Sequence, residues 1–165
     1  MQLTDGQATS AYMSRDHWLP DKPVLIYNID TFVSPTELTP DKIRLGSDGW
    51  IPCFQAKGEH WSFVKLAENG WAIDVAEKKR ISNFASIGLY WFARRKYFEQ
   101  AYECAFAVEE NLVLGERYIA PLYRKLISAG LKVSISQLPS DAVHVLGTPA
   151  ELEKFLQVKG AELRI

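Results

Sequence analysis

The segment 61–77, WSFVKLAENGWAIDVAE, predicts a β-hairpin in the middle of the chain. Two strand-like runs flank Asn69-Gly70, a dipeptide that favours the type I′ turn because both of its positions need a positive φ. A two-residue loop at this dipeptide fixes how the two strands pair. The expected pairs are Glu68 with Trp71, Lys65 with Asp74, Val64 with Val75, and Ser62 with Glu77.

The predicted register places a charged side chain on an apolar face. Because side chains alternate along a strand, four apolar residues share one face, which is predicted to be buried. These residues are Val64, Leu66, Ile73 and Val75. Glu77 ends the same face, and a carboxylate there needs a hydrogen-bonding partner or a ligand. Lys78 is expected to point the other way, next to Trp61. Two interpretations stay open for Glu77 and Lys78: they flank a phosphorylated or hydroxyl-rich ligand, or they end the strand in solvent.

Upstream of the hairpin, the sequence predicts a helix at 6–17 and strands at 24–29 and 50–56. The segment 24–29, VLIYNI, is nearly all apolar, as expected of a strand covered on both faces, and it ends at Asp30. Ligands of open α/β sheets bind outside the carboxyl ends of strands, where a carboxylate can hold Mg²⁺. The residues alone favour a turn-capping role for Asp30, since aspartate is a common turn former.

Downstream of the hairpin, strands and helices alternate. Strands are expected at 86–92, 132–138, 142–146 and 161–165, and helices at 94–108 and 118–127. Gly130 is placed to cap the second of these helices. A further helix begins at Thr148 as N-cap, and Glu151 completes a capping box. This order predicts a single mixed α/β domain that covers residues 1–165.

The composition limits the classes of function. With 165 residues, 47% of them hydrophobic, the chain can bury a sizeable core. Its formal net charge of -1 argues against nucleic acid as a partner, since phosphate-backbone binders show a basic surplus. No apolar run is long enough to predict a membrane span. Cys53 and Cys104 lie far apart in apolar contexts, which favours reduced thiols in a cytoplasmic protein.

Several segments, taken together and in order, are similar to the motifs of one enzyme family. They are Asp5-Gly6-Gln7-Ala8, Tyr27-Asn28-Ile29-Asp30, Val75-Ala76-Glu77-Lys78, the segment 82–90, Gly115-Glu116 followed by Tyr118 and Tyr123, and Gly147-Thr148-Pro149 with Leu152. The chain thus resembles the sugar-phosphate nucleotidyltransferases over nearly its whole length. These enzymes join a nucleoside triphosphate to a phosphorylated sugar or small alcohol and release pyrophosphate. The resemblance implies a Rossmann-like mixed sheet of the nucleotide-diphospho-sugar transferase type.

The resemblance also implies a cofactor and residue roles. Asp30 is expected to hold Mg²⁺ and Lys78 to orient the incoming phosphate, so both are expected catalytic residues. Glu77 is expected to bind sugar hydroxyls, and Gly6 and Gln7 to lie against the base, where glycine permits a close backbone approach. The expected substrate-binding residues are Gly6, Gln7, Glu77, Lys78, Asn83 and Gly88.

The sequence departs from the family pattern in three places. The family's glycine-rich, triphosphate-binding loop is not found, which predicts an N-terminally truncated domain that is inactive alone or is completed by another chain. The missing part would leave a strand edge open, which favours homo-oligomers. Val145 takes the place of a second metal-binding aspartate, and Ser62 that of a glycine near the sugar.

The expected function is transfer of a nucleotidyl group to a sugar-1-phosphate for surface-polysaccharide precursors in the cytoplasm. One alternative is a cytidylyltransferase that acts on a phospho-alcohol such as phosphocholine. A second is a non-catalytic sugar-phosphate-binding module, which Val145 and the missing loop favour. A third is a glycosyltransferase-like enzyme, against which stands the lack of an Asp-x-Asp motif.

Overall fold

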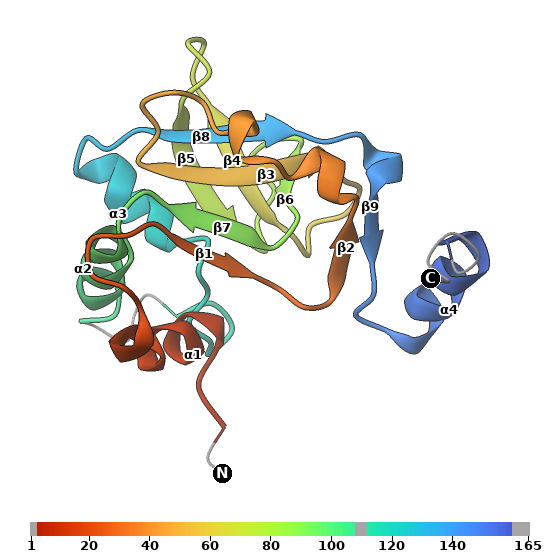
Figure 1. The fold of residues 1–165 in the computed structure, drawn as a ribbon, viewed down its shortest axis with the longest axis horizontal. Helices are drawn as coiled ribbons and strands as arrows, with labels where there is room; N and C mark the ends of the chain where they lie inside the picture. The colour runs from red at the N-terminus through yellow and green to blue at the C-terminus, as the bar shows by residue number, and fades with distance from the viewer. Residues whose placement is uncertain (1–2, 108–111, 160–165) are drawn as a thin grey trace.

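A sheet with helices packed on one face forms the centre of the molecule (Figure 1). The computed structural model describes residues 3–107 and 112–159. Among these residues, seven strands form one sheet in the order β1-β7-β3-β6-β4-β5, with β8 paired in parallel to β3. Its strands are β1 (Val24–Tyr27), β3 (Gly49–Gln55), β4 (Ser62–Leu66), β5 (Ala72–Glu77), β6 (Phe84–Ser86), β7 (Leu89–Phe92) and β8 (Val133–Gln137). The other pairings of this sheet are antiparallel.

The remaining elements cover the sheet and extend one end of it. The α-helices are α1 (Gln7–Met13), α2 (Arg95–Ala105), α3 (Leu122–Ser128) and α4 (Pro149–Lys159), and the short 3₁₀ helices span 15–17, 35–37, 40–42 and 140–142. Strands β2 (Thr31–Val33) and β9 (Val143–Val145) pair with each other beyond the carboxyl end of β1, with α4 farther out (Figure 1). None of the described helices combines the length and the apolar character needed to cross a bilayer.

Buried side chains lie on both faces of the sheet. One cluster joins Ile51, Val75 and Phe92 of the strands to residues of α1, α2 and α3. The other cluster, on the opposite face, is centred on Trp50 and Phe63. Two buried layers and a mixed sheet confirm the predicted α/β class.

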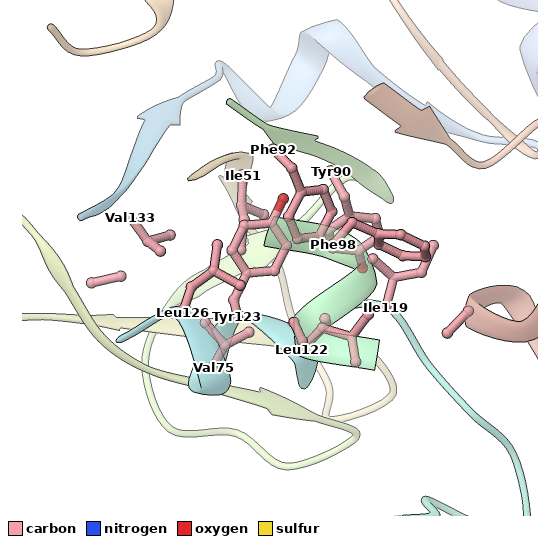
Figure 2. Close-up of a cluster of buried hydrophobic side chains, with 14 of the residues drawn as sticks. Ile51, Val75, Tyr90, Phe92, Phe98, Ile119, Leu122, Tyr123, Leu126 and Val133 are labelled. Atoms are coloured by element: carbon pink, nitrogen blue, oxygen red, sulfur yellow. The ribbon is translucent and has the colours of Figure 1, made fainter. Parts of the chain in front are cut away.

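Tyr123 fixes α3 to the first of these layers (Figure 2). Its side chain is fully buried, and its ring stacks on Phe92 with 4.6 Å between the centroids. The hydroxyl donates a hydrogen bond to the carbonyl oxygen of Trp91 at 2.9 Å. Gly49 makes room for the ring, because a Cβ at Gly49 would lie 2.7 Å from it. Tyr123 is therefore a core residue, as are Phe98 and Tyr102 of α2.

The hairpin of β4 and β5 has the predicted register over most of its length. Ser62 pairs with Glu77, and Lys65 pairs with Asp74. The turn differs from the prediction: Gly70 has a φ of 80°, but Asn69 is not among the residues with positive φ. The amide of Ala67 donates to the carbonyl oxygen of Trp71, which makes the loop three residues long. A glycine in the left-handed region at the end of such a loop is a common hairpin solution, so the predicted type I′ turn is wrong.

A bulge next to the turn changes one of the predicted inward residues. The pairing shifts after Lys65, so that Leu66 faces Ala72. Ile73 is 49% exposed, whereas Ala72 is buried. The prediction that Ile73 shares the buried face is therefore wrong, because the bulge adds one residue to β5 and turns Ile73 outward.

Two predicted strands also need correction. The segment 86–92 is divided between β6 and β7 at Gly88, which has a φ of 81° and whose Cβ would lie 2.7 Å from the side chain of Asn28. β1 is not covered on both faces, since Leu25 is 55% exposed. In the described part of the chain β1 pairs with β7 alone, which makes it an edge strand.

Most of the other predicted elements lie near their expected positions. The helix expected at 118–127 begins later, at Leu122, because residues 117 and 118 belong to a segment that bonds to the start of α1. Gly130 caps α3 with a φ of 78°, as predicted. The strand expected at 161–165 lies outside the described residues.

Candidate active site

A cleft of 410 Å³ opens at the ends of β1, β4 and β5. Polar and aromatic groups from seven separate parts of the chain line it. These are Gln7, the segment Asn28, Asp30 and Thr31, the segment 60–62, Glu77 with Lys78, the segment 86–90 without Leu89, Tyr118, and the segment Val145, Gly147, Thr148 and Glu151. Convergence of charged and polar groups in one concave site is the usual mark of a ligand-binding site.

The structure places five of the expected site residues in this cleft: Gln7, Asp30, Glu77, Lys78 and Gly88. Gly6 and Asn83 are not among its lining residues. The side-chain oxygen of Asn83 accepts a hydrogen bond from the Arg80 guanidinium at 3.1 Å. Arg80 also donates to the carbonyl oxygen of Ala56, so Asn83 belongs to a set of contacts that shape the loop after β5.

The Glu77 carboxyl group accepts a hydrogen bond from a hydroxyl group of the neighbouring strand β4. Ser62 lies opposite Glu77 in the hairpin and donates a hydrogen bond to Oε2. The Ser62 hydroxyl is also 3.2 Å from that of Tyr90. Burial raises the pKa of Glu77, and the Ser62 hydrogen bond and the charge of Lys78 partly oppose this shift. Burial also raises the pKa of Tyr90 to about 12, so its hydroxyl stays protonated. The predicted need of Glu77 for a partner is thus met by Ser62.

Replacing Glu77 with glutamine is expected to stabilise the fold at neutral pH. Because the pKa of Glu77 is raised in the folded state, the native protein binds its proton more tightly than the unfolded chain does. The contribution of Glu77 to stability is therefore present below the ordinary glutamate pKa and is lost as the pH rises through the folded-state pKa. Thermal unfolding of both proteins from pH 4 to pH 7 should show a gain that grows with pH.

Glu68→Gln, in the exposed hairpin loop, is the matched control. It removes the same charge from solvent and is expected to leave the pH dependence of the unfolding temperature as in the original chain. A Glu77→Gln variant that follows the pH dependence of this control would contradict the effect of burial.

Lys78 turns back toward the same cleft, although strict alternation predicts the opposite direction. Its φ is 50°, which is uncommon for a residue with a side chain, so the alternation of β5 ends at this residue. Its amide donates to the carbonyl oxygen of Trp61 at 2.9 Å, next to which Lys78 was expected. The ammonium donates to the hydroxyl of Tyr118 at 2.5 Å, and this hydrogen bond is the main reason why the pKa of Lys78 is raised.

Two carboxylates, those of Asp30 and Glu151, lie beside Gly147 on one rim of the cleft. A Cβ at Gly147 would be 3.6 Å from Oδ2 of Asp30 and 3.8 Å from Oε2 of Glu151. The capping box sets Glu151, whose Oε2 accepts hydrogen bonds from the amide and the hydroxyl of Thr148 at 2.9 and 2.8 Å. The backbone of Asp30 is tied to the same rim, because its carbonyl oxygen accepts from the Leu146 amide at 2.7 Å.

These oxygen donors fit the requirements of Mg²⁺. Mg²⁺ is commonly held by one or two carboxylates and takes its other ligands from phosphate groups and water. No group of three or more His, Cys, Asp or Glu side chains suited to a metal occurs in the described residues. Asp30, with Glu151 as the nearby carboxylate, is therefore suited to an ion that a phosphorylated ligand helps to hold.

Sequence reasoning missed several residues of this cleft. His60 and Trp61 line it with 4.5 Å between their ring centroids and the rings tilted by 40°, and no spacing pattern in the sequence indicated them. Tyr118 and Glu151 were noted, but only as part of a motif and as a helix cap. A larger hollow of 520 Å³ lies beside β5 and α3, but its arginine, Arg124, is already paired with Asp74 at 2.8 Å.

Comparison with known proteins found solved structures that are similar to this chain. No family model and no curated protein matches the chain. The nucleoside-diphosphate-sugar pyrophosphorylase from Vibrio cholerae RC9 matches with a TM-score of 0.83 and 32% identity, over 94% of this chain and 66% of that chain. The inositol-1-phosphate CTP transferase from T. maritima matches with a TM-score of 0.65 and 14% identity, over 94% and 62%. The CTP:phosphocholine cytidylyltransferase from Streptococcus pneumoniae matches with a TM-score of 0.66 and 12% identity, over 93% and 63%.

The chain spans less than two thirds of the length of each of these proteins. The two matches with low identity bear on the fold alone, whereas the match to the Vibrio cholerae protein also includes 32% sequence identity. The chain therefore has the fold of the nucleotide-sugar transferases, and its structural neighbours are nucleotidyltransferases.

Proposed function

We propose that the cleft binds a sugar-1-phosphate for nucleotidyl transfer from a nucleoside triphosphate, with release of pyrophosphate. The observation that carries this proposal is the convergence of the Glu77 carboxyl, the Lys78 ammonium and the Asp30 carboxylate on one cleft. A sugar phosphate offers hydroxyl groups to the first and a phosphate to the second. The 32% identity to a sugar pyrophosphorylase supports the same choice. The product, a nucleotide sugar, is the kind of donor that surface-polysaccharide synthesis consumes.

The reaction asks the protein mainly for position and charge. An oxygen of the sugar phosphate attacks the α-phosphorus of the triphosphate, and the bond from that phosphorus to the pyrophosphate breaks. Lys78 would orient the attacking phosphate, and Glu77 would accept hydrogen bonds from sugar hydroxyls. Gln7 would lie beside the nucleotide base. Mg²⁺, held by Asp30 with Glu151 nearby, would neutralise phosphate charge when bound.

The hydroxyl groups around Glu77 favour a sugar over a phospho-alcohol. Ser62 holds one oxygen of the carboxylate, and Tyr90 lies within hydrogen-bonding distance of Ser62. Such an arrangement suits a ligand with hydroxyl donors. A cytidylyltransferase acting on phosphocholine is the second candidate, because Trp61 and Tyr118 give the cleft aromatic faces that attract a quaternary ammonium.

A ligand panel tests the proposal on the chain as it stands. The panel contains the 1-phosphates of glucose, galactose, mannose and N-acetylglucosamine, phosphocholine, and each nucleoside triphosphate, all with and without Mg²⁺. Tryptophan fluorescence reports binding because Trp61 lines the cleft. We expect a sugar-1-phosphate to bind, and Glu77→Ala and Lys78→Ala each to weaken it about tenfold to a hundredfold, as for hydrogen bonds to charged groups.

Lys79→Ala is the matched control, since Lys79 follows Lys78 but lines the other hollow instead of this cleft. The affinity of this variant for the sugar-1-phosphate is expected to equal that of the original chain. Tighter binding of phosphocholine than of every sugar phosphate would favour the second candidate. A folded chain that binds no member of the panel would rule out both. The non-catalytic module and a domain without the triphosphate-binding loop both predict binding of sugar phosphate but of no triphosphate, so binding of a triphosphate would argue against the module.

A further inference from the structure

The Lys78–Tyr118 contact joins two parts of the chain that are far apart in sequence. The ammonium lies 2.5 Å from the Tyr118 hydroxyl and 4.6 Å from the centroid of its ring. Both residues line the cleft. Lysine side chains carry about 2 kcal/mol of rotamer entropy, so an exposed lysine without a partner loses affinity when a ligand fixes it. A partner that orders the ammonium beforehand lowers this cost.

Tyr118 can act as such a partner because the segment before it is firmly attached to the start of α1. The Arg117 amide donates to the carbonyl oxygen of Asp5 at 2.7 Å, and the carbonyl oxygen of Arg117 accepts from the Ala8 amide at 3.0 Å. The Arg117 guanidinium also pairs with the Asp5 carboxylate at 3.1 Å. On the other side of Tyr118, Ile119 is fully buried. Tyr118 is thus fixed at both ends.

The chemistry of the hydroxyl suits acceptance of a hydrogen bond from lysine. Burial and Glu116 raise the pKa of Tyr118, and the hydrogen bond and charge of Lys78 lower it only in part, so the phenol stays neutral. The oxygen of a neutral phenol is an acceptor, so it can accept the hydrogen bond from Lys78. An ammonium has three donors, so a hydrogen bond to Tyr118 leaves two for a ligand.

We infer that Tyr118 is a positioning residue, whose hydroxyl holds the Lys78 ammonium ready for the phosphate of the ligand. The inference rests on the proposed phosphate-binding role of Lys78 and adds a residue to it. Tyr118 acts through Lys78 and need not touch the ligand itself. The segment 117–118 therefore links the start of α1, which carries Gln7, to the phosphate side of the cleft.

A double-mutant cycle tests the inference. Tyr118→Phe keeps the ring and removes the hydroxyl, and Lys78→Met removes the ammonium but keeps a long side chain. The probe is the sugar-1-phosphate of the panel that binds the original chain most tightly, and its Kd is measured by calorimetry. We expect Tyr118→Phe to raise this Kd about tenfold. In the Lys78→Met background the same substitution is expected to change the Kd less than twofold, because positions that act as a unit are not additive.

The outcomes of the cycle distinguish failure of the positioning role from failure of the phosphate site. A Tyr118→Phe variant that binds the probe like the original chain, while Lys78→Met does not, would overturn the positioning role alone. Equal, additive effects in both backgrounds would also overturn it, since Tyr118 would then act without Lys78. A Lys78→Met variant with unchanged affinity would overturn the proposed phosphate site itself. Tyr97→Phe, on α2 and outside this cleft, serves as the control for loss of a tyrosine hydroxyl, and thermal unfolding verifies that all variants fold.

Discussion

Replacing Gly6 with alanine is expected to lower the free energy of unfolding by about 3 kcal/mol, from backbone strain and overpacking together. A Cβ at Gly6 would lie 2.5 Å from the carbonyl oxygen of Arg117 and 2.7 Å from its amide nitrogen. Both atoms belong to backbone, which cannot move aside as a flexible side chain could. The φ of Gly6 is 133°, a conformation that residues with a side chain rarely adopt. The substitution therefore separates the start of α1 from the segment that carries Tyr118.

Gly46→Ala is the matched control for this prediction. Gly46 also has a positive φ, 82°, but a Cβ there would meet no atom within 4 Å. Its expected cost is therefore about 1 kcal/mol, from the backbone conformation alone. Denaturant unfolding of both variants measures the difference. If Gly6→Ala lowered the free energy of unfolding no more than Gly46→Ala, the close contact with Arg117 would not contribute to the cost of the substitution.

Gly6 is needed for a close approach, as expected, but the group that approaches it differs from the expected one. The resemblance implied that glycine was needed for a close approach of the nucleotide base. The structure shows a close approach, but to the backbone of Arg117. Gln7, the next residue, does line the cleft. The sequence could not distinguish contact with the base from contact with the Arg117 backbone. A glycine indicates that another group comes close, but it does not indicate which group.

The hairpin shows how much of the fold could be predicted. The pairing of Ser62 with Glu77 was predicted from a two-residue loop, and the structure reaches it by another route. The three-residue loop shifts the pairing by one residue, so that Leu66 faces Ala72, and the bulge after Lys65 restores the predicted register. The turn was less predictable, because Asn-Gly is compatible with loops of two and of three residues. The environment of β1 could not be predicted either. Its apolar composition is the same for a central strand and for an edge strand, and only the sheet order shows which one it is.

The candidate site also contains residues that could be predicted from the sequence and residues that could not. Glu77 could be predicted because a carboxylate on a buried face conflicts with its surroundings. The residues alone favoured a turn-capping role for Asp30, and only the resemblance implied that it belongs to the site. Trp61, Tyr118 and Glu151 reach the cleft from separate segments, so no local spacing reveals them. The direction of Lys78 depends on a positive φ that lysine rarely adopts, which makes it unpredictable from residue type.

Replacing Tyr123 with alanine is expected to have the largest effect on stability, a loss of about 4 kcal/mol. The side chain is fully buried between the sheet and α3, and the substitution would leave a cavity beside Phe92 (Figure 2). It would also leave the carbonyl oxygen of Trp91 without its hydrogen bond from the phenol. Urea unfolding, followed by tryptophan fluorescence and by circular dichroism, measures the loss and tests whether the transition is cooperative.

Tyr123→Phe separates packing from hydrogen bonding in this prediction. It keeps the ring against Phe92 and Gly49 and removes only the hydroxyl, so its expected cost is about 1 kcal/mol. A cost for Tyr123→Phe close to that for Tyr123→Ala would show that the hydrogen bond to Trp91, and not the packed ring, holds α3 in place. Because α3 follows directly on the segment 117–121, the ring also supports the Tyr118 end of the cleft. Under conditions in which both variants are folded, Tyr123→Phe should therefore bind the sugar phosphate like the original chain, and Tyr123→Ala should bind it more weakly.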